Sequence, residues 1–362
     1  MYIRMMVRRT LVVGAMAIAV LVACSDGSGP GLPPRTYFMG FSAIPPRFDS
    51  TTAYLIAAID NWVPHADAAI MHVSPPWGAM LAGYPPAQAV DTVEVPLANY
   101  YRSKNLKIVF TVDATDGLNR AAEAPELVSL GRSITDTAVQ RVYREWVYAV
   151  ATKIHPDYLG LAAETNLIKA LAPDSVYQAL VTMTNAVAGQ INAASVPTNL
   201  FVSVQVETAW GRLGGGTYVG IAQDLADFPF VQAIGLSSYP YLGGFAQPED
   251  VPLNYYSRIA QDAAKPVLVV EGGWSSVSFD TLVSSSPAEQ ARYIARQVQL
   301  LDSARAKAVF QLTFYDLDLS ASPPPPGSIL PLFAHVGLAD SAFNPKPALA
   351  VWDAAFHRSY AP

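Results

Sequence analysis

The amino-acid sequence predicts an α/β fold, a single (β/α)8 TIM barrel, on two observations. Eight short apolar runs recur between residues 36 and 316, and segments with helical spacing of apolar residues fill the gaps between them. Strands that alternate with helices form parallel sheets, and eight such units are enough to close a barrel. With 362 residues, of which 51% are hydrophobic and 14% charged, the chain can bury the core that this fold needs.

The predicted strands are rich in Val, Ile, Leu and aromatic residues, as is typical of strands buried on both faces. In chain order they are "TYFMGFSA" from Thr36, "DAAIMHVS" from Asp67, "LKIVFTVDA" from Leu106, "DYLGLAAETN" from Asp157, "LFVSVQVET" from Leu200, "VQAIGLSSYP" from Val231, "KPVLVVEGG" from Lys265 and "KAVFQLTFYD" from Lys307. Their spacing leaves room for one helix and two loops after each strand.

Helices are predicted where apolar residues lie three and four positions apart. The segments 134–154 and 174–193 show this pattern, and 286–304 adds a capping box in which Ser286 precedes Pro287 and Glu289. An open, doubly wound sheet is the alternative fold. No glycine-rich phosphate-binding turn follows the first strand, so the closed barrel is preferred.

The N-terminus has the pattern of an export signal. Three arginines precede the apolar stretch "TLVVGAMAIAVLVA", which is short for a membrane span and ends in "LVAC". Cys24 is the only cysteine, and its place resembles the lipidation site of bacterial lipoproteins. We therefore expect a lipoprotein signal peptide (1–23), a Gly/Pro/Ser tether (24–35) and one barrel domain (36–362), held in the bacterial cell envelope by a lipid on Cys24. An ordinary signal peptide with an incidental cysteine is the alternative.

Composition and motifs argue against several functions. The net charge of -6 leaves no basic patch for nucleic acid, and the five histidines show no metal-binding spacing. There is no G-x-S-x-G nucleophile motif, and "GRLGGGTY" lacks the Lys-Ser/Thr ending of a phosphate-binding loop. We expect a monomer without cofactor or metal, whose contact with a membrane is limited to the lipid.

Polar and aromatic residues close many of the predicted strands. In a TIM barrel these C-terminal strand ends meet at one rim, where the active site lies. A single such residue is most often a helix cap or a loop hydrogen-bonder, but a full rim of them indicates a site. The residues in these positions are His72, Asp113, Glu164, Asn166, Gln205, Glu207, Tyr239, Tyr241, Glu271, Trp274, Tyr315 and Asp316.

This arrangement resembles clan A of the glycoside hydrolases. The resemblance rests on glutamates at the ends of predicted strands four and seven, on "EGGW" from Glu271, on "SSYPY" and on the closing segment "VGLADSAFNPKPALAVWDAAF". It implies that Glu164 is the general acid/base and Glu271 the nucleophile of a retaining mechanism. By the same resemblance, Tyr239 approaches the nucleophile, and a hydrogen bond from its hydroxyl would keep Glu271 ionised.

Further residues are candidates for binding substrate. Trp77, Trp210, Trp274 and Tyr315 can either stack on sugar faces or pack inside the protein. Asn166, Tyr241, Glu207, Asp113 and His72 complete the predicted substrate-binding set.

The sequence also departs from the pattern of the clan. Ala163 stands where an asparagine usually precedes the acid/base, Asn166 is aimed elsewhere by the strand pleat, and strand eight lacks its usual tryptophan. The leading hypothesis is a retaining glycoside hydrolase that cleaves a β-linked oligo- or polysaccharide. The alternative is a carbohydrate-binding lipoprotein on a barrel that has lost catalysis.

Overall fold

The computed structural model describes residues 33–279 and 283–362. The predicted signal peptide, Cys24 and the tether up to residue 32 lie outside the described residues. The compact barrel unit begins at Pro34, two residues before the expected domain boundary. Arg35 belongs to it, because its guanidinium pairs with Asp67 at 2.7 Å and its backbone N–H donates to the Ser359 carbonyl at 2.9 Å.

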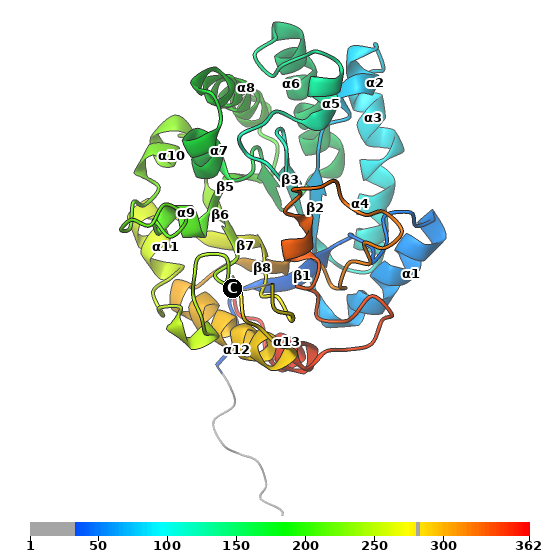
Figure 1. The fold of residues 1–362 in the computed structure, drawn as a ribbon. Helices are drawn as coiled ribbons and strands as arrows, with labels where there is room; N and C mark the ends of the chain where they lie inside the picture. Colours follow the sequence, from blue (N-terminus) through cyan, green and yellow to red (C-terminus); the bar gives the residue numbers. More distant parts are fainter. Residues whose placement is uncertain (1–32, 280–282) are drawn as a thin grey trace, which may run out of the picture. The chain divides into compact units, whose positions relative to one another are not determined.

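All eight predicted strands are present, and they form one closed parallel barrel in the order β1 to β8 (Figure 1). The predicted (β/α)8 fold is therefore confirmed. The strands are β1 (Phe38–Ser42), β2 (Ala68–Val73), β3 (Lys107–Val112), β4 (Tyr158–Gly160), β5 (Asn199–Gln205), β6 (Ala233–Ser238), β7 (Val267–Gly272) and β8 (Ala308–Gln311).

Helices surround the barrel. They are α1 (Thr52–Trp62), α2 (Trp77–Leu81), α3 (Pro86–Thr92), α4 (Glu94–Ser103), α5 (Pro125–Ser129), α6 (Thr137–Ile154), α7 (Thr165–Leu171), α8 (Asp174–Ala193), α9 (Val206–Ala209), α10 (Ala222–Asp227), α11 (Ser257–Ala263), α12 (Pro287–Ala304) and α13 (Pro347–Phe356), with 3₁₀ turns at Val63–His65, Pro248–Asp250 and Leu330–Phe333. The three helices predicted above are α6, α8 and α12. Ser286 caps α12 as expected, since its side chain accepts from the Glu289 N–H. Within the described residues, no helix is both long and apolar enough to cross a membrane.

Side chains that alternate along the strands fill the inside of the barrel. The small inner cluster consists of Ala68, Ile70, Val109, Phe201, Ala233, Leu268, Val270, Ala308 and Phe310. Phe201 is accommodated because Gly160 and Gly235 face it. A Cβ at either glycine would lie 2.6 or 2.8 Å from the Phe201 ring, closer than packed atoms can approach. The filled interior closes the barrel below its C-terminal rim, so the rim forms the floor of any ligand site.

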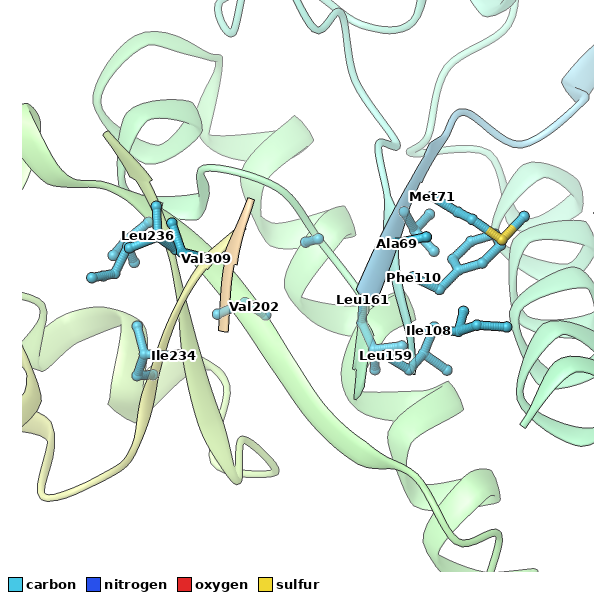
Figure 2. Packing of buried hydrophobic residues seen from close by; sticks show 14 of the residues in the cluster. Ala69, Met71, Ile108, Phe110, Leu159, Leu161, Val202, Ile234, Leu236 and Val309 are labelled. Atoms are coloured by element: carbon cyan, nitrogen blue, oxygen red, sulfur yellow. The ribbon is translucent and has the colours of Figure 1, made fainter. Parts of the chain in front are cut away.

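The other strand residues face outward and pack against the helices. Figure 2 shows part of this layer, in which Met71, Ile108 and Phe110 point away from the strands toward neighbouring helices. In α6, Val139, Val142, Tyr143, Trp146 and Val150 are all buried at helical spacing, as the sequence predicts. This outer core holds the strands in register and thereby fixes the positions of the side chains at the rim.

Candidate active site

A β-bulge in β7 turns Glu271 toward the rim. Leu236 of β6 pairs with Val269, but the next residue, Ser237, pairs with Glu271, so Val270 is an extra residue. Because Val270 already faces the barrel interior, strict alternation would send Glu271 outward to the helices. The bulge adds one residue and reverses that direction, as bulges beside active sites commonly do.

His72 of β2 contacts the bulged residue, Val270. Its Nε2 lies 3.1 Å from the Val270 carbonyl, which fixes Nε2 as the protonated nitrogen because a carbonyl can only accept. Nδ1 then has a free lone pair, and it lies 3.8 Å from Glu271 Oε2. Burial lowers the pKa of His72, which favours this neutral form.

Glu164 follows β4 and precedes α7. Its backbone is left-handed, with φ 48° and ψ 47°, a conformation that costs energy in a non-glycine residue. The Glu164 N–H donates to Ser203 Oγ at 2.9 Å, which helps to hold the turn. This turn brings the Glu164 carboxyl to the same part of the rim as Glu271.

Ser237 of β6 connects the two carboxyl groups. Its Oγ lies 2.7 Å from Glu164 Oε1 and 2.7 Å from Glu271 Oε1. The two Oε1 atoms are therefore no more than twice that distance apart. This limit on one pair of oxygens is compatible with the spacing of about 5–5.5 Å between the carboxyl groups of retaining glycosidases.

The Ser237 contacts also restrict how protons can be placed on the pair. A hydroxyl has one proton, so Ser237 can donate to only one of the two carboxyl groups. The second contact is a hydrogen bond only when the other carboxyl is protonated and donates to Ser237 Oγ. At least one of the two carboxyl groups must therefore carry a proton if both contacts are hydrogen bonds.

Arg120 distinguishes the two glutamates. Its Nε donates to Glu164 Oε2 at 2.8 Å and its Nη1 to Asp113 Oδ1 at 2.6 Å, and all three residues line the site. This guanidinium favours the charged form of Glu164. Burial, and then the charge of Glu164, raise the pKa of Glu271 to about 7. The ion pair of Glu164 with Arg120 and the raised pKa of Glu271 both favour Glu271 as the carrier of a shared proton.

These groups open into a cavity of about 420 Å³ at the rim. Of the predicted site residues, His72, Asp113, Glu164, Tyr239 and Glu271 line it. The Tyr239 ring packs edge-on against Phe333 at 4.8 Å, and its hydroxyl makes no hydrogen bond to Glu271 among the described residues. The hydroxyl contact expected from Tyr239 is instead made by Ser237.

The four aromatic residues predicted to stack on sugars do not line this cavity. Trp77 stacks on Tyr143, Trp274 stacks on Tyr293, and Trp210 stacks on Tyr255. Tyr315 is buried, and its hydroxyl donates to the Ala58 carbonyl at 3.0 Å. Tyr241 is likewise tied to the Leu332 carbonyl at 2.9 Å. These side chains pack the rim and its loops.

Two further predicted residues also serve the scaffold. The amide of Asn166 forms a pair of hydrogen bonds with the backbone N–H and carbonyl of Gln205, at 2.8 and 2.9 Å. Glu207 is fully buried, and its Oε1 accepts from the Tyr239 N–H and the Tyr255 hydroxyl at 3.1 and 2.9 Å. Neither side chain lines the cavity.

Arg120 and Ser237 were missing from the predicted site. Ser237 had a usable signal, because it lies two residues after the inward-facing Gly235 and alternation places it inside the rim. Arg120 had none, since it lies in a loop whose path depends on Asp113 and Glu164. Gln205 also lines the cavity, and although it closes its predicted strand, it is not among the residues predicted for the site. Within the described residues, no group of three or more His, Cys, Asp or Glu side chains is placed to hold a metal ion.

No family model and no curated protein matches the sequence. Solved structures match over most of the barrel. An exo-β-1,4-mannosidase, Op5Man5, from Opitutaceae bacterium strain TAV5 superposes with a TM-score of 0.64 at 14% identity, over 90% of this chain and 60% of that one. The chain thus spans less than two thirds of that protein.

Two smaller proteins match over more of their own length. A GH5_18 protein from Bifidobacterium longum subsp. infantis has a TM-score of 0.62 at 14% identity, over 91% of this chain and 80% of that chain. A GH5_18 variant from Streptomyces cattleya in complex with Manb1-4GlcNAc has a TM-score of 0.61 at 15% identity, over 91% and 82%. At these identities the likeness shows the fold alone: this chain folds as the barrels of clan A glycoside hydrolases do.

Proposed function

We propose that the protein is a retaining glycoside hydrolase that cleaves a β-linked carbohydrate. The observation that carries the proposal is the pair of carboxyl groups bridged by Ser237 in an open cavity, at a separation compatible with a double-displacement mechanism. The names of the structural neighbours, among them a mannosidase and two β-glucuronidases, support the same class of reaction.

In the proposed mechanism Ser237 prepares the pair for reaction. Glu271 donates its proton to Ser237 Oγ while the Ser237 hydroxyl proton passes to Glu164. A glycosidic oxygen beside Glu164 favours this transfer, because it can accept a hydrogen bond only from the protonated carboxyl. The result is an acid at Glu164 and a carboxylate at Glu271.

The bond changes then follow the two-step route. The Glu271 carboxylate attacks the anomeric carbon, and Glu164 gives its proton to the leaving oxygen as the glycosidic bond breaks. Glu164, now ionised and stabilised by Arg120, takes a proton from water, whose oxygen displaces Glu271 from the sugar. Arg120 is suited to this second step, since it stabilises the charged form of Glu164.

A carbohydrate-binding protein without catalysis is the second candidate, on two specific observations. Arg120 pairs with Glu164 at 2.8 Å, which opposes protonation of the proposed acid, and Ala163 supplies no contact to a sugar hydroxyl. In that case the carboxyl pair would bind sugar hydroxyls and transfer no proton.

Azide rescue tests the proposal and the two roles. Wild type, Glu271→Ala and Glu164→Ala are assayed on dinitrophenyl β-glycosides, with Glu145→Ala on the exposed surface of α6 as control. Azide should yield an α-glycosyl azide with Glu271→Ala and a β-glycosyl azide with Glu164→Ala, because it replaces the nucleophile in one and attacks the intermediate in the other. Wild-type turnover that survives both substitutions contradicts the mechanism, and binding of sugars without any turnover supports the second candidate.

We further propose that the barrel is exported and held in the cell envelope through a lipid on Cys24. The support is the sequence pattern before and at this cysteine. Labelling with a radioactive fatty acid should mark the wild type and not Cys24→Ser. Equal labelling of both would contradict the anchor.

A further inference from the structure

The mouth of the cavity is apolar, in contrast to its polar floor. Five large apolar side chains line the cavity while remaining 40 to 54% exposed. We call them the apolar collar: Phe48, Leu118, Leu171, Leu213 and Ile329. A folded chain gains nothing by leaving such side chains in water, and a gathered patch of them commonly marks a binding surface.

The collar is assembled from five separate parts of the chain. Phe48 follows β1, Leu118 follows β3, Leu171 ends α7, Leu213 follows α9, and Ile329 lies in the long connection after β8. These segments are far apart in sequence, yet each contributes its apolar side chain to the same cavity. Convergence of this kind distinguishes the collar from isolated exposed leucines such as Leu253, which does not line the cavity.

The cavity has further apolar lining that is less exposed than the collar. It consists of Leu167, Leu242, Leu312 and Phe333, which are all half-buried. Polar lining groups are concentrated at the strand ends, around Glu164 and Glu271. The loop residue Asn119 also lines the cavity, but its Oδ1 already accepts from the Ala121 N–H at 3.2 Å.

Such a wall does not suit a second sugar. Sugar hydroxyls that leave water need hydrogen-bond partners, and aliphatic side chains offer none. Stacking on a sugar ring calls for aromatic plates, but none of the described tryptophans lines the cavity. The lining includes Tyr239, Phe333 and Phe48, but the rings of Tyr239 and Phe333 pack edge-on against each other, and most of the wall is aliphatic. The volume of about 420 Å³ is near the lower end for small-ligand sites, which also disfavours a chain of sugars.

We propose that the substrate is a β-glycoside whose aglycone is an apolar alkyl chain. The sugar would lie on the polar floor, with its glycosidic oxygen beside Glu164, and the chain would run out along the apolar collar. This inference rests on the proposed glycoside hydrolase function and names the group on the other side of the scissile bond.

The test compares alkyl β-glycosides that share one sugar. Methyl, butyl and octyl β-glycosides of glucose, galactose and mannose are assayed below their micelle concentrations for kcat/KM, and their binding is measured by calorimetry. On the sugar that is accepted, kcat/KM should rise roughly threefold for each methylene that the collar covers. Disaccharides of the same sugar should be poorer substrates than the octyl glycoside.

Two collar substitutions with a matched control locate the effect. In the double variant Leu171→Asn/Leu213→Asn, the ratio of octyl to methyl kcat/KM should fall about tenfold. Leu253→Asn alters a leucine of similar exposure, 53%, away from the cavity and should leave the ratio at the wild-type value. Thermal unfolding of each variant checks that the fold is intact.

The outcomes separate this inference from the proposed function. Turnover of glycosides with no dependence on chain length overturns the alkyl aglycone and leaves the hydrolase. Tight binding of octyl glycosides that depends on the collar, without turnover, supports the apolar site and overturns the hydrolase. If the glycosides are neither bound nor turned over, both proposals are overturned. A preference for disaccharides over the octyl glycoside assigns the collar to sugar instead.

Discussion

Glu271 is half-buried and Glu207 is fully buried, and the two glutamates have similar pKa values in different surroundings. Burial raises the pKa of each to about 7. Glu207 is enclosed by protein donors, including the Tyr239 N–H and the Tyr255 hydroxyl, whereas Glu271 opens into the cavity. A raised pKa therefore does not identify a catalytic group by itself. What separates the two is access to a ligand and a second carboxyl within reach of Ser237.

The largest expected effect is the loss of activity on substitution of Glu271, the glutamate that opens into the cavity. Glu271→Gln should lower kcat/KM on the order of 10⁴-fold or more, because it removes the nucleophile, while the folded state is retained. Glu207→Gln, the matched change in the closed site, should leave kcat/KM within about tenfold of wild type for the folded protein. Equal losses of activity in the two variants would contradict the assignment of Glu271 to catalysis and of Glu207 to the scaffold.

The second largest effect concerns stability, and here the substitution of Glu207 is expected to be more damaging than that of Glu271. Glu207→Ala should lower the free energy of unfolding by about 3–5 kcal/mol, because it leaves buried donors from Tyr239 and Tyr255 without acceptors. Glu271→Ala should cost far less, since water in the cavity can replace its contacts. Denaturant unfolding monitored by tryptophan fluorescence measures both, and a larger loss for Glu271→Ala would contradict this division.

The pH dependence of stability sharpens the comparison. An unfolded glutamate has a pKa near 4.5, whereas burial, and then the charge of Glu164, raise the pKa of Glu271 to about 7. Asp113, His72 and Arg120 also line the cavity beside it. Between these values the folded state holds a proton that the unfolded chain has released, so stability falls as the pH rises from about 4.5 to about 7. The contribution is at most about 3 kcal/mol.

Glu271→Gln removes this titration. The Tm of Glu271→Gln relative to that of the wild type should therefore increase as the pH rises from about 4.5 to about 7. Glu207→Gln should show the same trend. Thermal unfolding at several pH values tests this. A Tm difference that does not change with pH would mean that the replaced carboxyl titrates as it does in water.

The smallest effect concerns the bridge between the carboxyl groups. Ser237→Ala should lower kcat/KM on the order of 10²-fold and displace its pH profile, because the shared proton loses its path. Ser237→Thr keeps a hydroxyl and should recover much of the activity with the wild-type profile. If kcat/KM and its pH profile are both unchanged in Ser237→Ala, the hydroxyl has no role in proton transfer.

The sequence determined the barrel and the candidates at its rim. Short runs rich in Val, such as "VLVV", favour strands buried on both faces, and the C-terminal ends of parallel strands meet at one rim whatever the loops do. This reasoning led to Glu164, Glu271, His72, Asp113 and Tyr239, all of which line the cavity. Their catalytic and binding roles stay predictions.

Tertiary structure decided where side chains point and what they meet. The residue type of Glu271 was visible in the sequence, but its direction depends on a bulge that arises only from pairing with β6. Trp77 and Trp274 carry no local signal that separates a sugar platform from core packing, and Tyr143 and Tyr293 cover them. Arg120, Ser237 and the apolar collar come together from distant segments. Such contacts depend on strand register and loop paths, which no short stretch of sequence encodes.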